Sequence, residues 1–132
     1  MTGRVYLDAS AAVKLVVVES ESAALAEYLT GTDARMSSRV VGVELLRAVR
    51  RLRPESEEHA RELLAAMELV DLDAEITARA SVLGPTGLRS LDAIHLASAL
   101  ALGSELDAFV TYDSRQADAA REAGLAVESP GS

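Results

Sequence analysis

The sequence of 132 residues has no cysteine and no tryptophan, and its other aromatic residues are three tyrosines and one phenylalanine. The lack of cysteine excludes disulfides and thiolate metal sites. Such scarce aromatics argue against a surface on which nucleic-acid bases stack. No apolar run is long enough to span a bilayer, and the N-terminus lacks the residue order of a secretory signal. We therefore expect a cytoplasmic protein that makes no use of a membrane.

Positive charge is also scarce, since the formal net charge is −8. An acidic surface repels phosphate, so binding of a nucleic acid would require a local basic patch or a bound metal ion. With 49% hydrophobic and 26% charged residues, the composition is that of an ordinary globular protein. The length, together with the absence of linkers, repeats and low-complexity segments, predicts one domain over residues 1–132.

Short apolar runs alternate with helical patterns along the chain. The runs that predict strands are residues 5–7, 35–38, 69–72, 108–112 and 125–127. Between them the spacing of apolar residues predicts helices, of which residues 39–53 give the strongest. Strands separated by helices predict right-handed crossovers and a parallel sheet, so the expected class is α/β. We also expect Ser10 and Ser90 to cap the helices that follow them, and residues 129–132 to be frayed.

Four acidic residues stand in unusually apolar surroundings. Asp8 and Asp113 each follow a predicted strand, Glu44 interrupts the apolar run 40–46, and Asp92 lies at the start of an apolar helix. In open α/β sheets, ligands bind at the carboxyl ends of the strands. Each acid taken alone is also explained as a helix cap, a turn residue or an exposed position.

The set of four acids predicts more than any one of them. Carboxylates are rarely buried without a partner, and converging carboxylates repel one another unless a cation lies among them. Oxygen ligands without cysteine or a histidine pair suit a hard ion, Mg²⁺ or Mn²⁺. The sequence therefore predicts a metal site, at which a bound ion could lower the pKa of a water molecule.

Four blocks of sequence carry a resemblance to a known family. They are Leu7-Asp8-Ala9-Ser10, Val43-Glu44-Leu45, Leu91-Asp92-Ala93-Ile94-His95-Leu96-Ala97 and Thr111-Tyr112-Asp113. In this order they resemble the PIN-domain ribonucleases, most closely the VapC-type toxins of bacterial toxin–antitoxin pairs. The resemblance extends over residues 5–127. It implies a PIN-like three-layer fold, with a central twisted parallel sheet of about five strands flanked by helices and the first strand near its middle.

The resemblance also implies an activity and its residues. Asp8, Glu44, Asp92 and Asp113 match the acids that hold the metal and carry catalysis, and Ser10 and Thr111 match hydroxyl positions beside them. The implied function is a Mg²⁺-dependent ribonuclease, with Mn²⁺ as a possible substitute, that cuts within RNA. A cognate antitoxin protein is implied as its inhibitor. We expect an arginine of that partner to pair with the carboxylates.

Several other residues are candidates for weaker roles. At helical spacing Glu44, Arg47 and Arg51 share one face, which could form a phosphate track or a solvated face paired with acids. Lys14 and Arg89 are further candidates for RNA binding.

His95 is three residues after Asp92, so it could reach the site or could instead pack within its helix. Tyr112 could contact a base or pack beside its strand. Apolar residues 16–18 and Ala23 suggest a homodimer.

Two alternatives belong to other functional classes. A receiver-type phosphoacceptor domain has a similar length and also gathers acids at strand ends. It needs an acidic pair after the first strand and a lysine after the last, whereas here Ala9 follows Asp8 and Glu128 follows Val127. A non-catalytic PIN-like domain that only binds partners is the second alternative, and it has no need of all four acids.

Overall fold

A five-stranded parallel sheet forms the centre of the computed structural model, which describes residues 3–132. The strands, in the order β3-β2-β1-β4-β5 across the sheet, are β1 (Arg4–Leu7), β2 (Ala34–Ser38), β3 (Glu68–Val70), β4 (Ala108–Val110) and β5 (Val127–Glu128). The first strand pairs with β2 on one side and with β4 on the other. The predicted α/β class, the parallel sheet and the central position of the first strand are confirmed.

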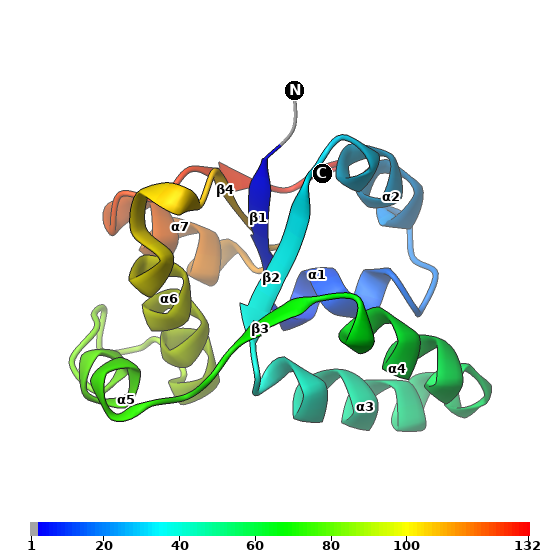
Figure 1. Cartoon of the computed structure of the whole chain (residues 1–132), viewed down its shortest axis with the longest axis horizontal. Helices are drawn as coiled ribbons and strands as arrows, with labels where there is room; N and C mark the ends of the chain where they lie inside the picture. The colour runs from blue at the N-terminus through cyan, green and yellow to red at the C-terminus, as the bar shows by residue number, and fades with distance from the viewer. Residues whose placement is uncertain (1–2) are drawn as a thin grey trace.

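Helices cover both faces of this sheet and complete three layers (Figure 1). On one face lie α1 (Ala9–Lys14), α2 (Ser22–Thr30), α3 (Val41–Leu52) and α4 (Glu57–Ala65). On the other lie α5 (Ala74–Ala80), α6 (Ser90–Leu102) and α7 (Ser114–Glu122). Two short 3₁₀ turns, η1 (Pro54–Ser56) and η2 (Gly103–Glu105), follow α3 and α6.

Alternation along the strands divides the core between the two faces. In β1, Val5 and Leu7 belong to the core beneath α1–α4, whereas Tyr6 belongs to the core beneath α6 and α7. In β4, Phe109 likewise faces the second core, where its ring stacks on that of Tyr6 with 5.3 Å between centroids. Because side chains on both faces are buried, these strands show continuous apolar runs in the sequence.

Parallel pairing sets the position of the site. All five strands run in the same direction, so their carboxyl ends share one edge of the sheet. The helices α1, α3 and α7 follow β1, β2 and β4 after connections of one to three residues. Their first turns therefore gather at that edge, which we call the carboxyl edge. Within residues 3–132, no helix combines the length and the apolar character needed to cross a bilayer.

Two predictions about helix caps were wrong. Asp8, not Ser10, caps α1, since its carboxylate accepts a hydrogen bond from the backbone N–H of Ala11. The helix begins one residue after the aspartate, which leaves Ser10 inside its first turn. Similarly, Ser90 is the first residue of α6, and Arg89 precedes it without a capping side chain.

The C-terminal segment is attached to the sheet rather than frayed. The Ser129 hydroxyl donates a hydrogen bond of 2.5 Å to the carbonyl of Thr111, and the Tyr112 hydroxyl donates one of 2.7 Å to the carbonyl of Pro130. Thr111 and Tyr112 come directly after β4, at the carboxyl edge. The C-terminal segment is therefore bonded to the part of the chain that borders this edge.

Candidate active site

Asp8 is the most deeply buried of the four acids, with 3% of its surface exposed. It directly follows β1 and caps α1. Its Oδ1 accepts hydrogen bonds from the Ser10 hydroxyl at 2.6 Å and from the Ala11 N–H at 3.1 Å. Its Oδ2 accepts one from the Thr111 hydroxyl at 2.5 Å. Three donors therefore fix the orientation of this carboxylate.

The two hydroxyl groups predicted to support the site connect the end of β1 to the segment after β4. Each hydroxyl gives its proton to Asp8 and accepts from a backbone N–H, Ser10 from Tyr112 at 2.9 Å and Thr111 from Asp113 at 3.1 Å. Since both protons point to Asp8, the 3.3 Å contact between the two hydroxyl oxygens is not itself a hydrogen bond in this arrangement. The segments around residues 8 and 111 are thus tied together by polar side chains.

Asp113 caps α7 from the neighbouring position at the edge. Its Oδ1 accepts the N–H groups of Arg115 at 2.9 Å and Gln116 at 3.3 Å. Among residues 3–132, no donor bonds to its Oδ2. One oxygen therefore orders the helix, while the other remains available at the partly exposed surface.

Glu44 and Asp92 reach the edge from the first turns of α3 and α6. The Glu44 Oε1 lies 2.6 Å from Nε2 of His95, whose Nδ1 lies 2.7 Å from the hydroxyl of Tyr6. No donor within residues 3–132 bonds to the side-chain carboxylate of Asp92. This carboxylate is half-buried and lacks the hydrogen bonds that compensate Asp8.

The charges of the other three acids act on Asp92. Burial raises the pKa of Asp92 above its ordinary value, and the negative charges of Asp113 and Asp8 raise it further. Glu44 adds to this effect, whereas His95 opposes it. Burial likewise raises the pKa of Asp8, although its hydrogen bonds act in the opposite direction. The charges of the other three acids therefore oppose the ionisation of Asp92 across the carboxyl edge.

Comparison with known proteins identifies the family. A sequence model of the PIN domain matches residues 5–122. The chain is also 43% identical to Ribonuclease VapC47 of Mycobacterium tuberculosis, over 96% of this chain and 97% of that protein. The chain belongs to the PIN-domain family. Identity at this level over nearly the full length also confirms the resemblance to VapC-type ribonucleases.

Solved structures show the same fold at lower sequence identity. The crystal structure of Mycobacterium tuberculosis VapC20, described as a sarcin–ricin loop cleaving toxin, superposes with a TM-score of 0.74 at 15% identity. It covers 92% of this chain and 95% of that one. The crystal structure of VapBC2 from Rickettsia felis, bound to a DNA fragment from its promoter, superposes with a TM-score of 0.68 at 18% identity. The match covers 96% of this chain and 98% of that one. These matches confirm the PIN-like fold of the chain.

The donor chemistry of this PIN domain fits a hard divalent cation. Within residues 3–132, none of the four acids forms an ion pair with lysine or arginine, and His95 beside Glu44 is the nearest basic partner. Among the described residues, oxygens without a protein donor remain on Asp92, Asp113 and Glu44. In this conformation no three acidic or imidazole groups of the described residues lie close enough to surround one ion. The charge and the ligand type thus fit Mg²⁺, although the carboxylates border the edge rather than converge on a point.

Two hollows flank Asp113 and carry the basic candidates. The first, of about 500 Å³, contains Ser10 and Glu44 together with Lys14 and Arg51. A second, of about 210 Å³, lies between α6 and α7 and is lined by Gly87, Leu88, Arg89, Asp92, Asp113, Ser114 and Arg115. The edge therefore has arginine on both sides of its acids, which is the local basic character that the net charge of −8 conceals.

The predicted basic residues are not equivalent. The Lys14 ammonium group bonds to Glu19 at 3.0 Å and to Glu21 at 2.9 Å, and it lies 4.8 Å from the centroid of the Tyr112 ring. Arg47 is exposed and lies outside the lining of the first hollow, whereas Arg51 is part of it.

Sequence reasoning did not single out two residues that the structure brings to the site. Arg115 lines the second hollow, and its position two residues after Asp113 was a signal for it. Gln116 is fully buried. Its side-chain amide donates a hydrogen bond of 2.9 Å to the backbone carbonyl of Asp92, and this bond links α7 to α6. No sequence pattern indicates that link.

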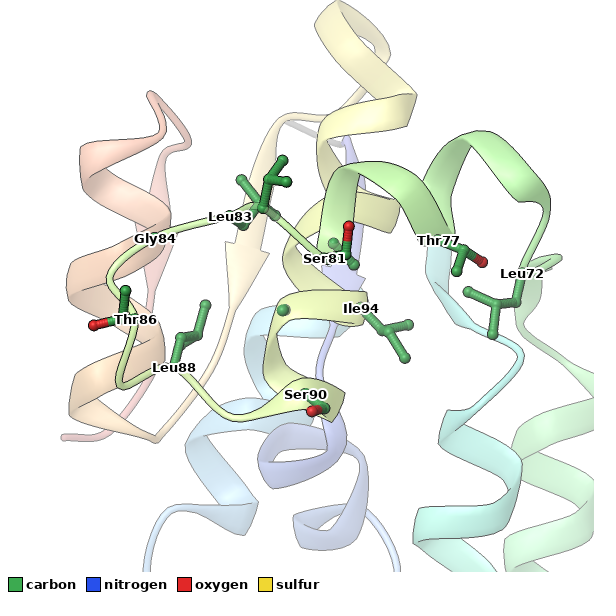
Figure 2. Close-up of a pocket in the computed structure, with 12 residues that line it drawn as sticks. Leu72, Thr77, Ser81, Leu83, Gly84, Thr86, Leu88, Ser90 and Ile94 are labelled. Atoms are coloured by element: carbon green, nitrogen blue, oxygen red, sulfur yellow. The ribbon is translucent and has the colours of Figure 1, made fainter.

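One further hollow lies apart from the acids. It has a volume of about 540 Å³ and is formed by α5, the loop after it and the first turns of α6. Figure 2 shows Leu72 and Ile94 on one side of it and Leu83 and Leu88 on the other. Its lining has no charged residue, so it offers none of the chemistry of the carboxyl edge.

Proposed function

We propose that this PIN domain, formed by residues 1–132, is a Mg²⁺-dependent endoribonuclease whose metal and catalytic residues are Asp8, Glu44, Asp92 and Asp113. The observation that carries the proposal is the position of these acids along the carboxyl edge, where burial raises the pKa of Asp92 and the negative charges of Asp113, Asp8 and Glu44 raise it further. Mn²⁺ would substitute because it accepts the same oxygen ligands. The names of relatives such as Ribonuclease VapC47 support RNA as the substrate.

Each side chain has a separate task in this proposal. Asp92, Asp113 and Glu44 would hold a divalent ion at the edge, and its positive charge would polarise the phosphate and lower the pKa of an attacking water. Asp8, oriented by Ser10 and Thr111, provides a fixed negative charge. Asp92 and Asp113 present oxygens that no protein donor of residues 3–132 occupies, so they are the groups best placed to bind the cation or accept a proton.

The RNA path follows the two hollows beside Asp113. Arg51 on one side and Arg89 with Arg115 on the other would bind phosphates of the strand and position the scissile bond over the acids. Lys14 has two carboxylate partners already, so its contribution would be smaller.

Cleavage of RNA tests the proposal directly. Wild-type protein should cut RNA with Mg²⁺ or Mn²⁺, and EDTA should stop it. Asp113→Asn and Glu44→Gln should each lower the rate about a thousandfold or more, as removal of an electrostatic group at a reacting centre does. Because Asp113 is also a helix cap, Asp73→Asn is the matched control, since the Asp73 carboxylate caps α5 and lines neither of the two hollows beside Asp113. Full activity of Asp113→Asn, or cleavage unaffected by EDTA, would contradict the proposal.

We further propose that the protein is the toxin of a toxin–antitoxin pair, acts in the cytoplasm, and is inhibited by its antitoxin. Two structures that share its fold, VapBC2 and a toxin–antitoxin complex from Klebsiella pneumoniae, support a partner of this kind. The uncompensated acids favour a partner segment that carries arginine, whose fork binds carboxylates with two hydrogen bonds. Replacing that arginine with alanine should restore RNA cleavage while the complex persists. A neighbouring small protein that neither binds nor inhibits would contradict the toxin assignment.

A homodimer is part of the same proposal. Of the apolar residues suggested for its interface, Val16 is 7% exposed and belongs to the core, whereas Val18 is 78% exposed and Ala23 is also exposed. Val18 and Ala23 would therefore carry the contact. Sedimentation of the purified protein should give the mass of a dimer, and a monomer at all concentrations would exclude it.

A further inference from the structure

Tyr6 and His95 are two buried polar side chains to which the proposed mechanism gives no task. Tyr6 is in the central strand β1 with none of its surface exposed, and His95 is in α6 with 1% exposed. Groups of this kind are costly to bury unless their hydrogen bonds are satisfied. Tyr6 and His95 are hydrogen-bonded to each other, and His95 is also hydrogen-bonded to Glu44.

The three side chains form a continuous row from the centre of the sheet to the carboxyl edge. The Tyr6 hydroxyl is 2.7 Å from Nδ1 of His95, and Nε2 of His95 is 2.6 Å from Oε1 of Glu44. The two rings meet edge to face with 5.7 Å between centroids, and Tyr6 is stacked on Phe109. Packing therefore leaves the histidine little freedom to turn away from Glu44.

The protons in this row follow from the hydrogen-bond geometry. The Tyr6 hydroxyl carries one proton, and at 2.7 Å it can donate this proton to Nδ1 of His95. An imidazole that accepts at Nδ1 carries its proton on Nε2 and donates to Glu44. This arrangement satisfies every group of the row and holds Oε1 of Glu44 against the protein.

We propose that Tyr6 and His95 are positioning residues that fix the Glu44 carboxylate, so that its Oε2 remains directed to the carboxyl edge for the cation. The proposal rests on the proposed function only for the identity of that cation. Glu44 stands on a long flexible side chain, 17% exposed, and lacks the multiple donors that hold Asp8. Fixing it before the cation arrives reduces the entropy lost on binding.

Partners behind a metal-binding carboxylate usually have a measurable effect. Loss of such a partner typically lowers metal affinity about 10-fold to 100-fold. We expect His95→Gln to lower Mn²⁺ affinity within that range. Tyr6→Phe keeps the ring stack and removes one neutral hydrogen bond, so it should lower affinity about fivefold.

Nitrogen NMR of the histidine side chains detects the hydrogen bonds of the row and does not depend on RNA cleavage. The chain has two histidines, and the exposed His59 supplies an internal reference. In the full-length, metal-free protein, Nε2 of His95 should be protonated and Nδ1 should not. Tyr6→Phe should shift the Nδ1 signal, Glu44→Ala should shift the Nε2 signal, and neither should shift His59. The matched control is Tyr28→Phe, a half-buried tyrosine on α2, which should leave His95 unchanged.

Calorimetric titration with Mn²⁺ then separates positioning from a merely structural effect. If the row acts through Glu44, Tyr6→Phe should weaken binding in the wild-type background and have no further effect in the Glu44→Ala background. Equal loss in both backgrounds would overturn the proposal, as would an Nδ1 signal unchanged by Tyr6→Phe.

Failure of the proposed function gives a different result. If wild-type protein does not bind Mn²⁺, the metal proposal is wrong, and the NMR shifts alone decide whether the row holds Glu44. Should His95→Gln fail to fold, Tyr6→Phe and its control still decide the question, since both keep the aromatic ring.

Discussion

The two sides of the carboxyl edge are built in different ways. On the strand side, Asp8 and Asp113 follow β1 and β4, cap helices and accept hydrogen bonds from hydroxyl or backbone donors. On the helix side, Glu44 has one partner, His95, and Asp92 has no donor to its carboxylate within residues 3–132. Both sides carry two acids, yet only the strand-side acids also serve to order the backbone.

The difference separates two uses of a buried carboxylate. Asp8 is held so firmly that it contributes to the fold as well as to the charge of the site. Asp92 contributes charge without a hydrogen-bond donor to its carboxylate among residues 3–132, and the protein tolerates the repulsion from Asp113. Such a group is stabilised when a cation arrives, so the helix side should respond to metal and the strand side should respond to loss of hydrogen bonds.

The largest expected effect comes from removing the charge on the helix side. Asp92→Asn should lower RNA cleavage about a thousandfold and should abolish the rise in melting temperature caused by Mg²⁺ in the wild type. Without metal, the variant should melt above the wild type, because repulsion among the acids is relieved. Melting curves with and without Mg²⁺ measure both effects on the melting temperature, and an RNA cleavage assay measures the rate.

The same substitution on the strand side should behave differently. In Asp8→Asn, the amide oxygen can still accept at one position, but the NH₂ group that replaces the other carboxylate oxygen cannot accept the hydrogen bond made there. We therefore expect this variant to melt below the wild type without metal. If both variants melt higher, the two sides are equivalent and the comparison is wrong.

Loss of one strand-side hydroxyl should have the next largest effect. Thr111→Val removes the donor to Asp8 and the acceptor of the Asp113 N–H without changing the shape of the side chain. Hydrogen bonds to charged groups contribute about 2 kcal/mol, so the free energy of unfolding should fall by about that amount. Urea denaturation measures it. Thr77→Val is the control, because the Thr77 hydroxyl bonds to a helical carbonyl at the exposed surface.

Substitution of basic residues should give smaller effects on RNA binding. Arg115→Ala removes a charge from the second hollow, and it should weaken binding about fivefold and lower the slope of log affinity against log salt by about 0.7. Lys14→Ala should change neither, because Glu19 and Glu21 already neutralise the ammonium group. The two variants are compared by the binding of a labelled RNA at several salt concentrations. Each variant also carries the inactivating Asp113→Asn substitution. Equal losses would show that the Lys14 ion pairs open when RNA binds.

The smallest expected effect is a dependence of stability on pH. Burial raises the pKa of Asp8 and Asp92 above the usual 3.8, so between the usual and the folded values the native state binds more protons than the unfolded chain. The free energy of unfolding then falls as pH rises through that window. Glu57, whose pKa is lowered to about 2 by Arg50 and Arg61, acts oppositely, but only below its ordinary value of 4.5.

Melting temperatures test this sign. Without metal, the wild type should lose stability as pH rises from about 4.5. Asp92→Asn should show a smaller slope, since one of the two raised groups is gone. If the melting temperature depends on pH with the same slope in both proteins, groups other than Asp92 cause the loss of stability.

Much of the fold followed from local patterns in the sequence. The five strands and the order of strand and helix were predicted, because a strand buried on both faces needs a continuous apolar run. The strand bounds were less accurate. Thr111 and Tyr112 were assigned to the strand, yet β4 ends at Val110, and their hydrogen bonds go to Asp8, Ser10 and the C-terminal segment.

By itself, the sequence determined that acids follow two parallel strands and begin two helices, which brings them to one edge of any such sheet. The tertiary structure alone decided how each acid is held. Thr111 reaches Asp8 across 103 positions, and His95 reaches Glu44 across 51. The first bond depends on the pairing of β4 with β1, and the second depends on how α6 packs on the sheet. No local pattern encodes either arrangement. For the same reason, the sequence left open whether His95 serves the site or the core, and the structure shows that it contacts both.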